Sequence, residues 1–276
     1  MAIIESVPSV RAVLPKVALL LGATVLAFLF HLGIGGSSLV GPLEIVQELF
    51  RGDTGETAVN TIVWKIRLPR ALGTIAIGAI LGAVGAAFQA FFRNPLAEPY
   101  IVGVSSGAGI GGTVALMLGV SSVAYGLGST VLAAAGGLLS LMLVLSLARR
   151  GGTVNVNTLL VAGVVVAAML GALMTNLLLL AGEDTNQVLR WLLGSVANLV
   201  WTEVLLVWIA AIVGFVILQY QTRSLNALAV SEFSSERMGV DLKKLRGVTL
   251  FTGTVATSVA VGAAGIIGFL GCLLYT

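Results

Sequence analysis

The sequence contains little charge. Only 10% of its 276 residues are Asp, Glu, Lys or Arg, whereas 58% are hydrophobic and the mean hydropathy is +1.06. Soluble domains carry about 25% charged residues, and a soluble fold cannot hide so much apolar surface. The scarcity of charge therefore indicates an integral membrane protein whose chain crosses a bilayer several times.

Strong charge of one sign and catalytic or metal-binding motifs are also missing. The net charge of +3 is too small for a nucleic-acid-binding surface, so no nucleic acid is expected. Cys272 and His31 are the only cysteine and histidine, which excludes an internal disulfide and leaves a poor metal site. No glycine-rich loop ends in Gly-Lys-Ser or Gly-Lys-Thr. We predict that the chain is not an enzyme, binds no metal or cofactor and does not itself hydrolyse nucleotide.

Long uncharged stretches divide the chain. A membrane core of about 30 Å requires about 20 apolar residues in a helix. Seven stretches meet this requirement and predict an all-α, polytopic transmembrane bundle that forms one domain over residues 1–276. They are residues 17–33, 71–92, 100–119, 125–148, 159–181, 204–221 and 247–268.

Glycine is abundant within these stretches. Gly78 and Gly82 lie four residues apart, as do Gly103, Gly107 and Gly111. Small residues at this spacing allow two helix backbones to approach closely. We expect close helix packing at these positions, and a flexible gate hinge is the alternative.

Lysine and arginine are unevenly distributed among the predicted loops. These residues are retained on the cytoplasmic side of a membrane. With the N-terminus inside, ten of the 15 basic residues lie in inner segments and five in outer ones. The inner set is Arg11, Lys16, Arg93, Arg149, Arg150, Arg223, Arg237, Lys243, Lys244 and Arg246, and the outer set is Arg51, Lys65, Arg67, Arg70 and Arg190. This distribution predicts a cytoplasmic N-terminus.

Several pieces of the sequence together resemble one family. They are Arg67-Leu-Pro-Arg70, Gln89, Arg93-Asn-Pro-Leu-Ala-Glu-Pro99, Gly103-Val-Ser-Ser-Gly-Ala-Gly109, Leu159-Leu-Val-Ala-Gly163 and residues 225–239. The chain resembles the FecCD family over residues 15–271. Members of that family are permeases of ATP-binding-cassette (ABC) importers for iron-siderophores, haem and cobalamin.

The resemblance implies a multi-pass permease in a prokaryotic plasma (inner) membrane. Its implied partners are a second copy in a homodimer, membrane lipid, an extracytoplasmic solute-binding protein and a cytoplasmic ATPase that binds ATP and Mg. The implied substrate is a metal chelate, moved by alternating access, and the wording of residues 99–107 favours iron-siderophore over haem or cobalamin. An ion-coupled secondary transporter is the alternative, but no acidic residue lies in the seven stretches, where such coupling would require one. A membrane-embedded enzyme or scaffold is the third hypothesis.

Arg67 and Arg70 lie three residues apart at the outer end of the second stretch. Guanidinium groups form bidentate pairs with carboxylates. The resemblance assigns these two arginines to docking glutamates of the binding protein. Snorkelling toward lipid headgroups is the alternative.

A short inner turn follows the second stretch, because two prolines each remove a backbone donor and restrict the preceding residue. We expect a sharp chain reversal there. The turn residues are Arg93, Asn94, Pro95, Glu98 and Pro99.

Polar residues after this turn and in the fifth stretch are candidates for the transport pathway or its gate. Hydroxyls and amides at membrane depth either line an aqueous path or bond neighbouring helices. The candidates are Ser105, Ser106, Asn155, Asn157 and Asn176.

The longest inner loop, residues 222–246, contains apolar residues at helical spacing, then residues 231–238 closed by Gly239, a helix stop. This predicts a short amphipathic element across the inner face. By resemblance it lays its apolar side in a groove of the ATPase, and contact with lipid is the alternative. Val230 stands where relatives have glycine. The assigned coupling residues are Leu225, Leu228, Ala229, Ser231, Glu232, Arg237 and Gly239.

The resemblance also concerns the end of the chain. FecCD-like permeases have ten spans and continue beyond the equivalent of residues 262–271, whereas this sequence stops at Thr276. We interpret the C-terminus as truncated or frameshifted, with seven of ten spans present. A shortened permease that still assembles is the alternative.

Overall fold

The computed structural model describes residues 10–34, 40–120, 127–150 and 153–268. The chain divides into two compact units, residues 1–71 and 72–276. Their boundary lies inside one continuous helix, α4 (Leu68–Phe92), rather than in a linker. The prediction of a single domain over residues 1–276 stays a prediction.

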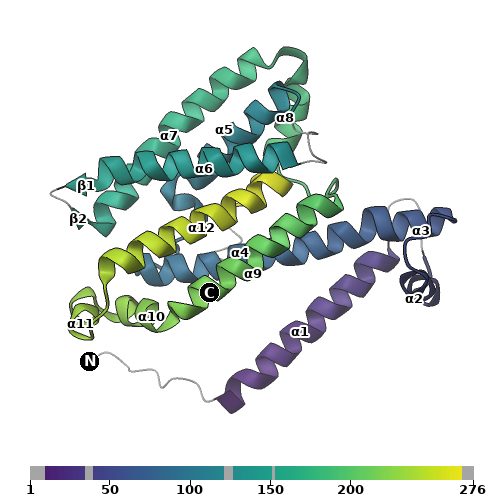
Figure 1. Ribbon diagram of the computed structural model, residues 1–276, viewed down its shortest axis with the longest axis horizontal. Helices are drawn as coiled ribbons and strands as arrows, with labels where there is room; N and C mark the ends of the chain where they lie inside the picture. Colours follow the sequence, from purple (N-terminus) through teal and green to yellow (C-terminus); the bar gives the residue numbers. More distant parts are fainter. Residues whose placement is uncertain (1–9, 35–39, 121–126, 151–152, 269–276) are drawn as a thin grey trace. The chain divides into compact units, whose positions relative to one another are not determined.

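The first unit contains α1 (Val10–Gly33), α2 (Pro42–Arg51), α3 (Ala58–Ile62) and the π-helical turn η1 (Val63–Arg67), as Figure 1 shows. Side chains of α1 are almost entirely exposed within the described residues, as expected of a helix surrounded by lipid. Helix α2 is attached to the following elements by Glu48. Its carboxylate accepts a hydrogen bond from Asn60 Nδ2 at 2.6 Å, and its carbonyl accepts one from Trp64 Nε1 at 3.0 Å.

The π-helical turn has a local cause. Pro69 has no N–H, so the carbonyl four residues earlier loses its usual helical donor. The hydrogen-bond ladder shifts there, and the Leu68 N–H donates to the Val63 carbonyl five residues back. The shift allows α3, η1 and α4 to continue as one apolar helical stretch over residues 58–92.

Within the described residues, the second unit contains the rest of α4 and ten further helical elements, together with a hairpin of two two-residue strands. The helical elements are η2 (Pro99–Val102), α5 (Val104–Met117), α6 (Leu127–Ala148), α7 (Val156–Leu180), η3 (Gly182–Asp184), α8 (Thr185–Leu192), α9 (Trp201–Tyr220), α10 (Thr222–Val230), α11 (Glu232–Arg237) and α12 (Leu242–Ala264). The strands are β1 (Arg149–Arg150) and β2 (Thr153–Val154). The predicted all-α class is confirmed.

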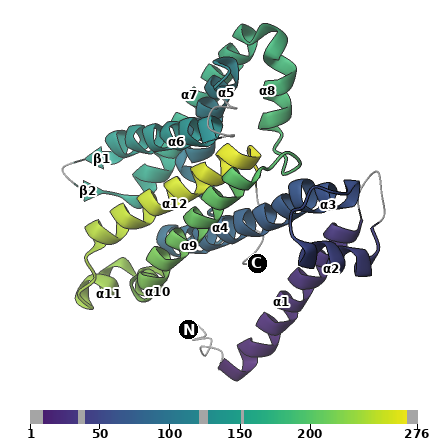
Figure 2. The same ribbon diagram turned by 45° about the vertical axis from the view of Figure 1, so that its right-hand side comes forward.

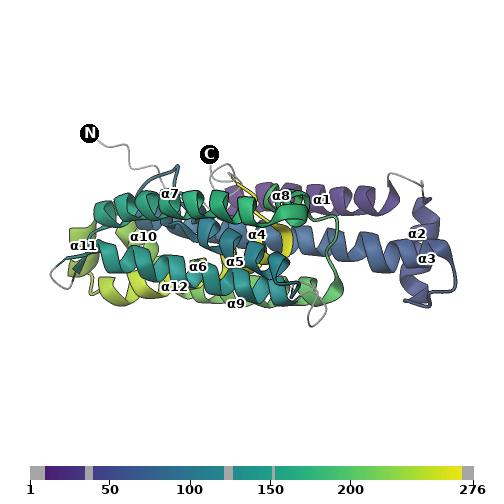
Figure 3. The same cartoon turned by 90° about the horizontal axis from the view of Figure 1, so that it is seen from above.

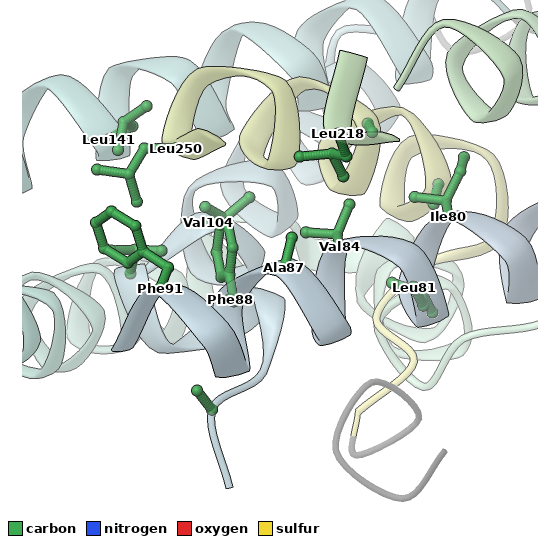
Figure 4. Close-up of a cluster of buried hydrophobic side chains, with 14 of the residues drawn as sticks. Ile80, Leu81, Val84, Ala87, Phe88, Phe91, Val104, Leu141, Leu218 and Leu250 are labelled. Carbon is green, nitrogen blue, oxygen red and sulfur yellow. The ribbon is translucent and has the colours of Figure 1, made fainter. Parts of the chain in front are cut away.

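Helix α6 lies between α5 and α12, and α9 packs on the other side of α12 (Figure 1). The apolar core runs along α4. Phe88 and Phe91 are fully buried there and point toward Val104 and Leu250, as Figure 4 shows.

Glycines bring α5 and α6 into backbone contact. A Cβ atom at Gly107 would collide with the Gly136 carbonyl, and one at Gly111 with the Leu132 carbonyl. The predicted close packing is confirmed for these two glycines. At Gly78 it is not, because a Cβ atom added there would meet no neighbouring group within 4 Å.

Six helices in the described residues are long and apolar enough to cross a membrane, and they correspond to six of the seven predicted spans. The predicted span at residues 100–119 is not among these six helices. Pro99 begins the 3-10 turn η2, and Gly103, with φ of 72°, separates it from α5, which has only 14 residues. This segment is therefore a broken, short helix, which a count of apolar residues does not reveal.

The second unit has two distinct ends. Helices α10 and α11 lie at the same end as β1 and β2, whereas α8 lies toward the opposite end (Figures 2 and 3). The predicted inner segments thus share one end of this unit, which we call the α10–α11 end.

Candidate functional site

Helices α10 and α11 form a hairpin at the α10–α11 end, as the predicted amphipathic element requires. Their burial differs from the prediction in one respect. Leu225 and Leu228 are 4% and 0% exposed and belong to the unit's own core, so they cannot lie in a partner's groove. The exposed apolar surface comes instead from Val230 and Phe233, at 82% and 62% exposure, and Ala229 beside them is also exposed.

The termini of α11 are fixed by local hydrogen bonds. Ser231 Oγ accepts from the Ser234 N–H at 3.4 Å, and its carbonyl accepts from the buried Ser235 hydroxyl at 2.7 Å. Gly239 has φ of 79°, and the Val240 N–H donates to the Ser235 carbonyl at 3.1 Å. This left-handed ending confirms Gly239 as the predicted stop.

Arg237 completes the exposed surface of α11. Its guanidinium carbon lies 4.2 Å from the centre of the Phe233 ring, a cation–π contact. The α10–α11 end therefore presents an apolar patch with an arginine at its rim.

The turn after α4 is as short as predicted. Arg93 has φ of 50°, and the Asn94 N–H still donates to the Gln89 carbonyl at 3.1 Å. Gln89 Nε2 donates to the Pro95 carbonyl at 2.9 Å, which closes the turn. Asn94 Oδ1 accepts from the Leu96 N–H at 3.0 Å. Of the remaining turn residues, Glu98 is half-buried, and Pro99, the first residue of η2, is buried.

Glu232 joins this turn to the α10–α11 hairpin. Its carboxylate forms ion pairs with Arg246, at the start of α12, and with Arg93, at a distance of 3.6 Å. Three residues beyond Arg246, Thr249 Oγ1 donates to Gln221 Oε1 at 2.8 Å, at the junction of α9 and α10. Sequence reasoning missed Gln221, Arg246 and Thr249, because nothing in their spacing indicates which residues they meet.

The predicted docking arginines lie in the first unit. Arg67 is 5% exposed and its Nη1 donates to the Leu32 carbonyl at the end of α1. Arg70 is half-buried. Arg67 is therefore not displayed on the surface, because its guanidinium is buried against the end of α1. The docking role stays a prediction.

The predicted pathway residues are held by their own helices. Asn155 Oδ1 accepts from the Asn157 N–H at 2.9 Å and caps α7, and Asn176 Nδ2 donates to the Ala172 carbonyl at 2.9 Å. All three asparagines are exposed, whereas Ser105 and Ser106 are half-buried in the first turn of α5. Their pathway role stays a prediction.

A cavity of about 600 Å³ opens at the end of the second unit opposite the hairpin. Its polar lining includes Gln187, Arg190, Asn198 and Glu203. The buried Glu203 lies inside α9, although the predicted span began one residue later. It occupies the first helical turn, where its carboxylate accepts from the Val200 N–H at 3.2 Å. An acidic residue thus lies within a span, but at its end rather than at its midpoint.

Relatives of known sequence share most of this chain. An uncharacterised ABC transporter permease protein of Bacillus subtilis is 34% identical over 266 residues, covering 93% of this chain and 75% of the relative. A cobalamin import system permease protein of Halobacterium salinarum is 37% identical, covering 79% and 58%. A vitamin B12 import system permease protein of Salmonella paratyphi A is 36% identical, covering 83% and 69%.

The fold also matches a solved structure. The structure of a metal-chelate type ABC transporter in an inward-facing conformation has a TM-score of 0.78 and 26% identity, covering 94% of this chain and 79% of that one. The model of the FecCD transport family matches residues 23–274. From helix α1 to the segment that follows α12, therefore, this chain belongs to the FecCD transport family.

Proposed function

We propose that the chain is the transmembrane permease subunit of a binding-protein-dependent ABC importer for a metal chelate. The observation that carries this proposal is the family match over residues 23–274, which includes every described helix that could span a membrane except the first part of α1. The chain itself contains no nucleotide-binding loop, so the energy for transport comes from a separate ATPase.

The α10–α11 hairpin is the segment that receives the ATPase. Its exposed patch of Val230 and Phe233 fits the mode in which a short helix lies in a groove of a soluble partner. Closure of the ATPase on ATP would push this patch, and two permease copies would alternate between outward and inward access. The binding protein would deliver substrate from the extracytoplasmic side and would dock on Arg67 and Arg70.

Basic residues support a cytoplasmic position for the hairpin. Among the described residues of the second unit, eight basic residues lie in elements or turns at the α10–α11 end, against Arg190 at the other end, so the positive-inside rule supports a cytoplasmic hairpin. The eight are Arg93, Arg149, Arg150, Arg223, Arg237, Lys243, Lys244 and Arg246. A cytoplasmic N-terminus and a prokaryotic plasma membrane are part of the same proposal.

Metal chelate is the substrate class shared by the sequence pattern and by the names of the relatives. Two of those relatives are named for cobalamin or vitamin B12, and the solved structure is described as of metal-chelate type. The sequence of residues 99–107 resembles that of iron-siderophore permeases. Cobalamin and a ferric siderophore are therefore the two chelates to compare.

The test is uptake into proteoliposomes that contain the permease, its ATPase and its binding protein. We expect ATP-dependent accumulation of radiolabelled cyanocobalamin or of a ferric siderophore, and none with a non-hydrolysable ATP analogue. Accumulation driven by a proton or sodium gradient without ATP would contradict the proposal and favour a secondary transporter.

A further inference from the structure

We infer that Glu232 is a positioning residue that links the ATPase-facing hairpin to two membrane helices at once. This inference rests on the proposed function, because it concerns how work done on the hairpin reaches the membrane. Glu232 is the first residue of α11, and its two carboxylate oxygens are directed to different elements. Oε1 pairs with Arg246 of α12, and Oε2 pairs with Arg93 at the end of α4.

A second contact attaches the start of the hairpin to α12. Gln221, just before α10, accepts the hydroxyl of the fully buried Thr249 on α12. Thr249 and Arg246 are three residues apart and so share one face of that helix. The hairpin is thus held to α12 at both its start and its middle. Among the ion pairs of the described residues, only that of Glu232 with Arg93 also joins the hairpin to the turn directly after α4.

The environment of Glu232 makes its pair with Arg246 stronger than an ordinary surface ion pair. The Arg246 side chain is only 15% exposed, and those of Glu232 and Arg93 are 38% and 40% exposed. Fully exposed pairs contribute little because water and salt screen them, and screening is weaker for a partly buried group. If the Glu232 carboxylate were removed, the guanidinium groups of Arg93 and Arg246 would also lose the negative charge that lies between them.

The geometry has a mechanical consequence. Phe233 follows Glu232 directly and is exposed, so a partner that presses on Phe233 presses on the residue beside the ion pairs. Because Glu232 is held from two sides, displacement of α11 is shared by α4 and α12. Loss of the carboxylate would let α11 move while these helices lag behind.

The test is Glu232→Gln in the reconstituted importer, with transport and ATP hydrolysis measured on the same sample. We expect chelate transported per ATP hydrolysed to fall about five- to tenfold, at the lower end of typical coupling between sites. Hydrolysis itself and co-purification with the ATPase should stay near wild type, because Ala229, Val230 and Phe233 are unchanged.

Glu236→Gln is the matched control. It removes the same charge from the same helix, and Glu236 is exposed and forms no ion pair among the described residues. The amount of chelate that this variant transports per ATP hydrolysed should equal that of the wild type. An equal fall in chelate transported per ATP hydrolysed in both variants would show that transport depends on the charge of α11 and not on the ion pairs. That result would overturn the inference.

A double-mutant cycle tests whether Glu232 acts through Arg246. If it does, Glu232→Gln combined with Arg246→Gln should be no more uncoupled than the worse single variant. Additive losses would refute the link. If wild-type protein transports no chelate with ATP, the proposed function fails; if it transports and Glu232→Gln keeps the wild-type ratio, only this inference fails.

Discussion

Asn60 shows at the scale of one residue how the first unit holds a polar group inside. Its side chain is fully buried, yet each of its hydrogen-bonding positions is used. Oδ1 accepts from the N–H groups of Thr54 and Gly55 at 3.1 and 3.0 Å, and Nδ2 donates to Glu48 Oε2 and the Gly52 carbonyl at 2.6 and 2.8 Å. A satisfied amide of this kind fixes the loop between α2 and α3.

Asn60→Asp should destabilise the first unit, because it removes both donations and places a second carboxylate against Glu48. We expect a loss of about 1–3 kcal/mol, the usual consequence of leaving a buried polar group unsatisfied. The measurement is the melting temperature in detergent, with limited proteolysis of the loop at residues 52–57. Gln47→Glu, which adds the same charge at an exposed position on α2, should leave both unchanged. Equal melting of the two variants would show that the Asn60 network does not hold this loop.

Helices α5 and α6 show what small residues contribute at the scale of elements. Lipid is as apolar as leucine, so helices in a membrane associate through close packing rather than through the hydrophobic effect. Gly107 and Gly111 meet the backbone of α6 near Gly136 and Leu132, where no side chain fits. The short α5 is thus held along much of its length by backbone contact.

Gly111→Ala should therefore loosen this pair, although alanine favours a helix more than glycine. The added Cβ collides with the Leu132 carbonyl, and overpacking of this kind costs about 1–3 kcal/mol. Thermal unfolding in detergent, followed by size-exclusion chromatography, measures the effect.

Gly171→Ala on α7 is the matched control, since a Cβ atom there would meet no neighbouring group within 4 Å. The higher helix propensity of alanine alone should stabilise the Gly171→Ala variant relative to the wild type by up to about 1 kcal/mol. Unfolding of Gly111→Ala at or above the wild-type temperature would contradict the packing argument.

Element positions could be predicted from the sequence where one physical requirement dominates. Bilayer thickness fixes the length of an apolar helix, so six spans follow from composition, and Gly239 follows from the need for a left-handed residue at a helix end. Side-chain direction does not follow from such local rules. Leu225 turned inward and Arg67 became buried because the neighbouring elements, which sequence spacing does not reveal, cover them.

At the scale of the whole chain, the distribution of basic residues within the second unit predicts its orientation in the membrane. Lysines and arginines occur in the hairpin, in the turn at Arg93 and at the start of α12, whereas α8 contributes only Arg190 at the other end. In the proposed mechanism the ATPase, which works where ATP is, meets the hairpin, so the charge distribution and the mechanism predict the same side for it. A measurement of orientation therefore tests the charge rule and the proposed ATPase contact together.

Single cysteines can test this orientation in membrane vesicles. In a Cys272→Ser background, Asn226→Cys places a thiol at an exposed position of α10, and Gln187→Cys places one at an exposed position of α8. We expect a membrane-impermeant maleimide to label the first only in inverted vesicles and the second only in right-side-out vesicles, because the basic end of the unit stays in the cytoplasm. Equal labelling of both variants in detergent is the control for thiol reactivity. The opposite pattern would place α10 and α11 outside the cell, where no ATPase could reach them, and would remove the physical basis for coupling through Glu232.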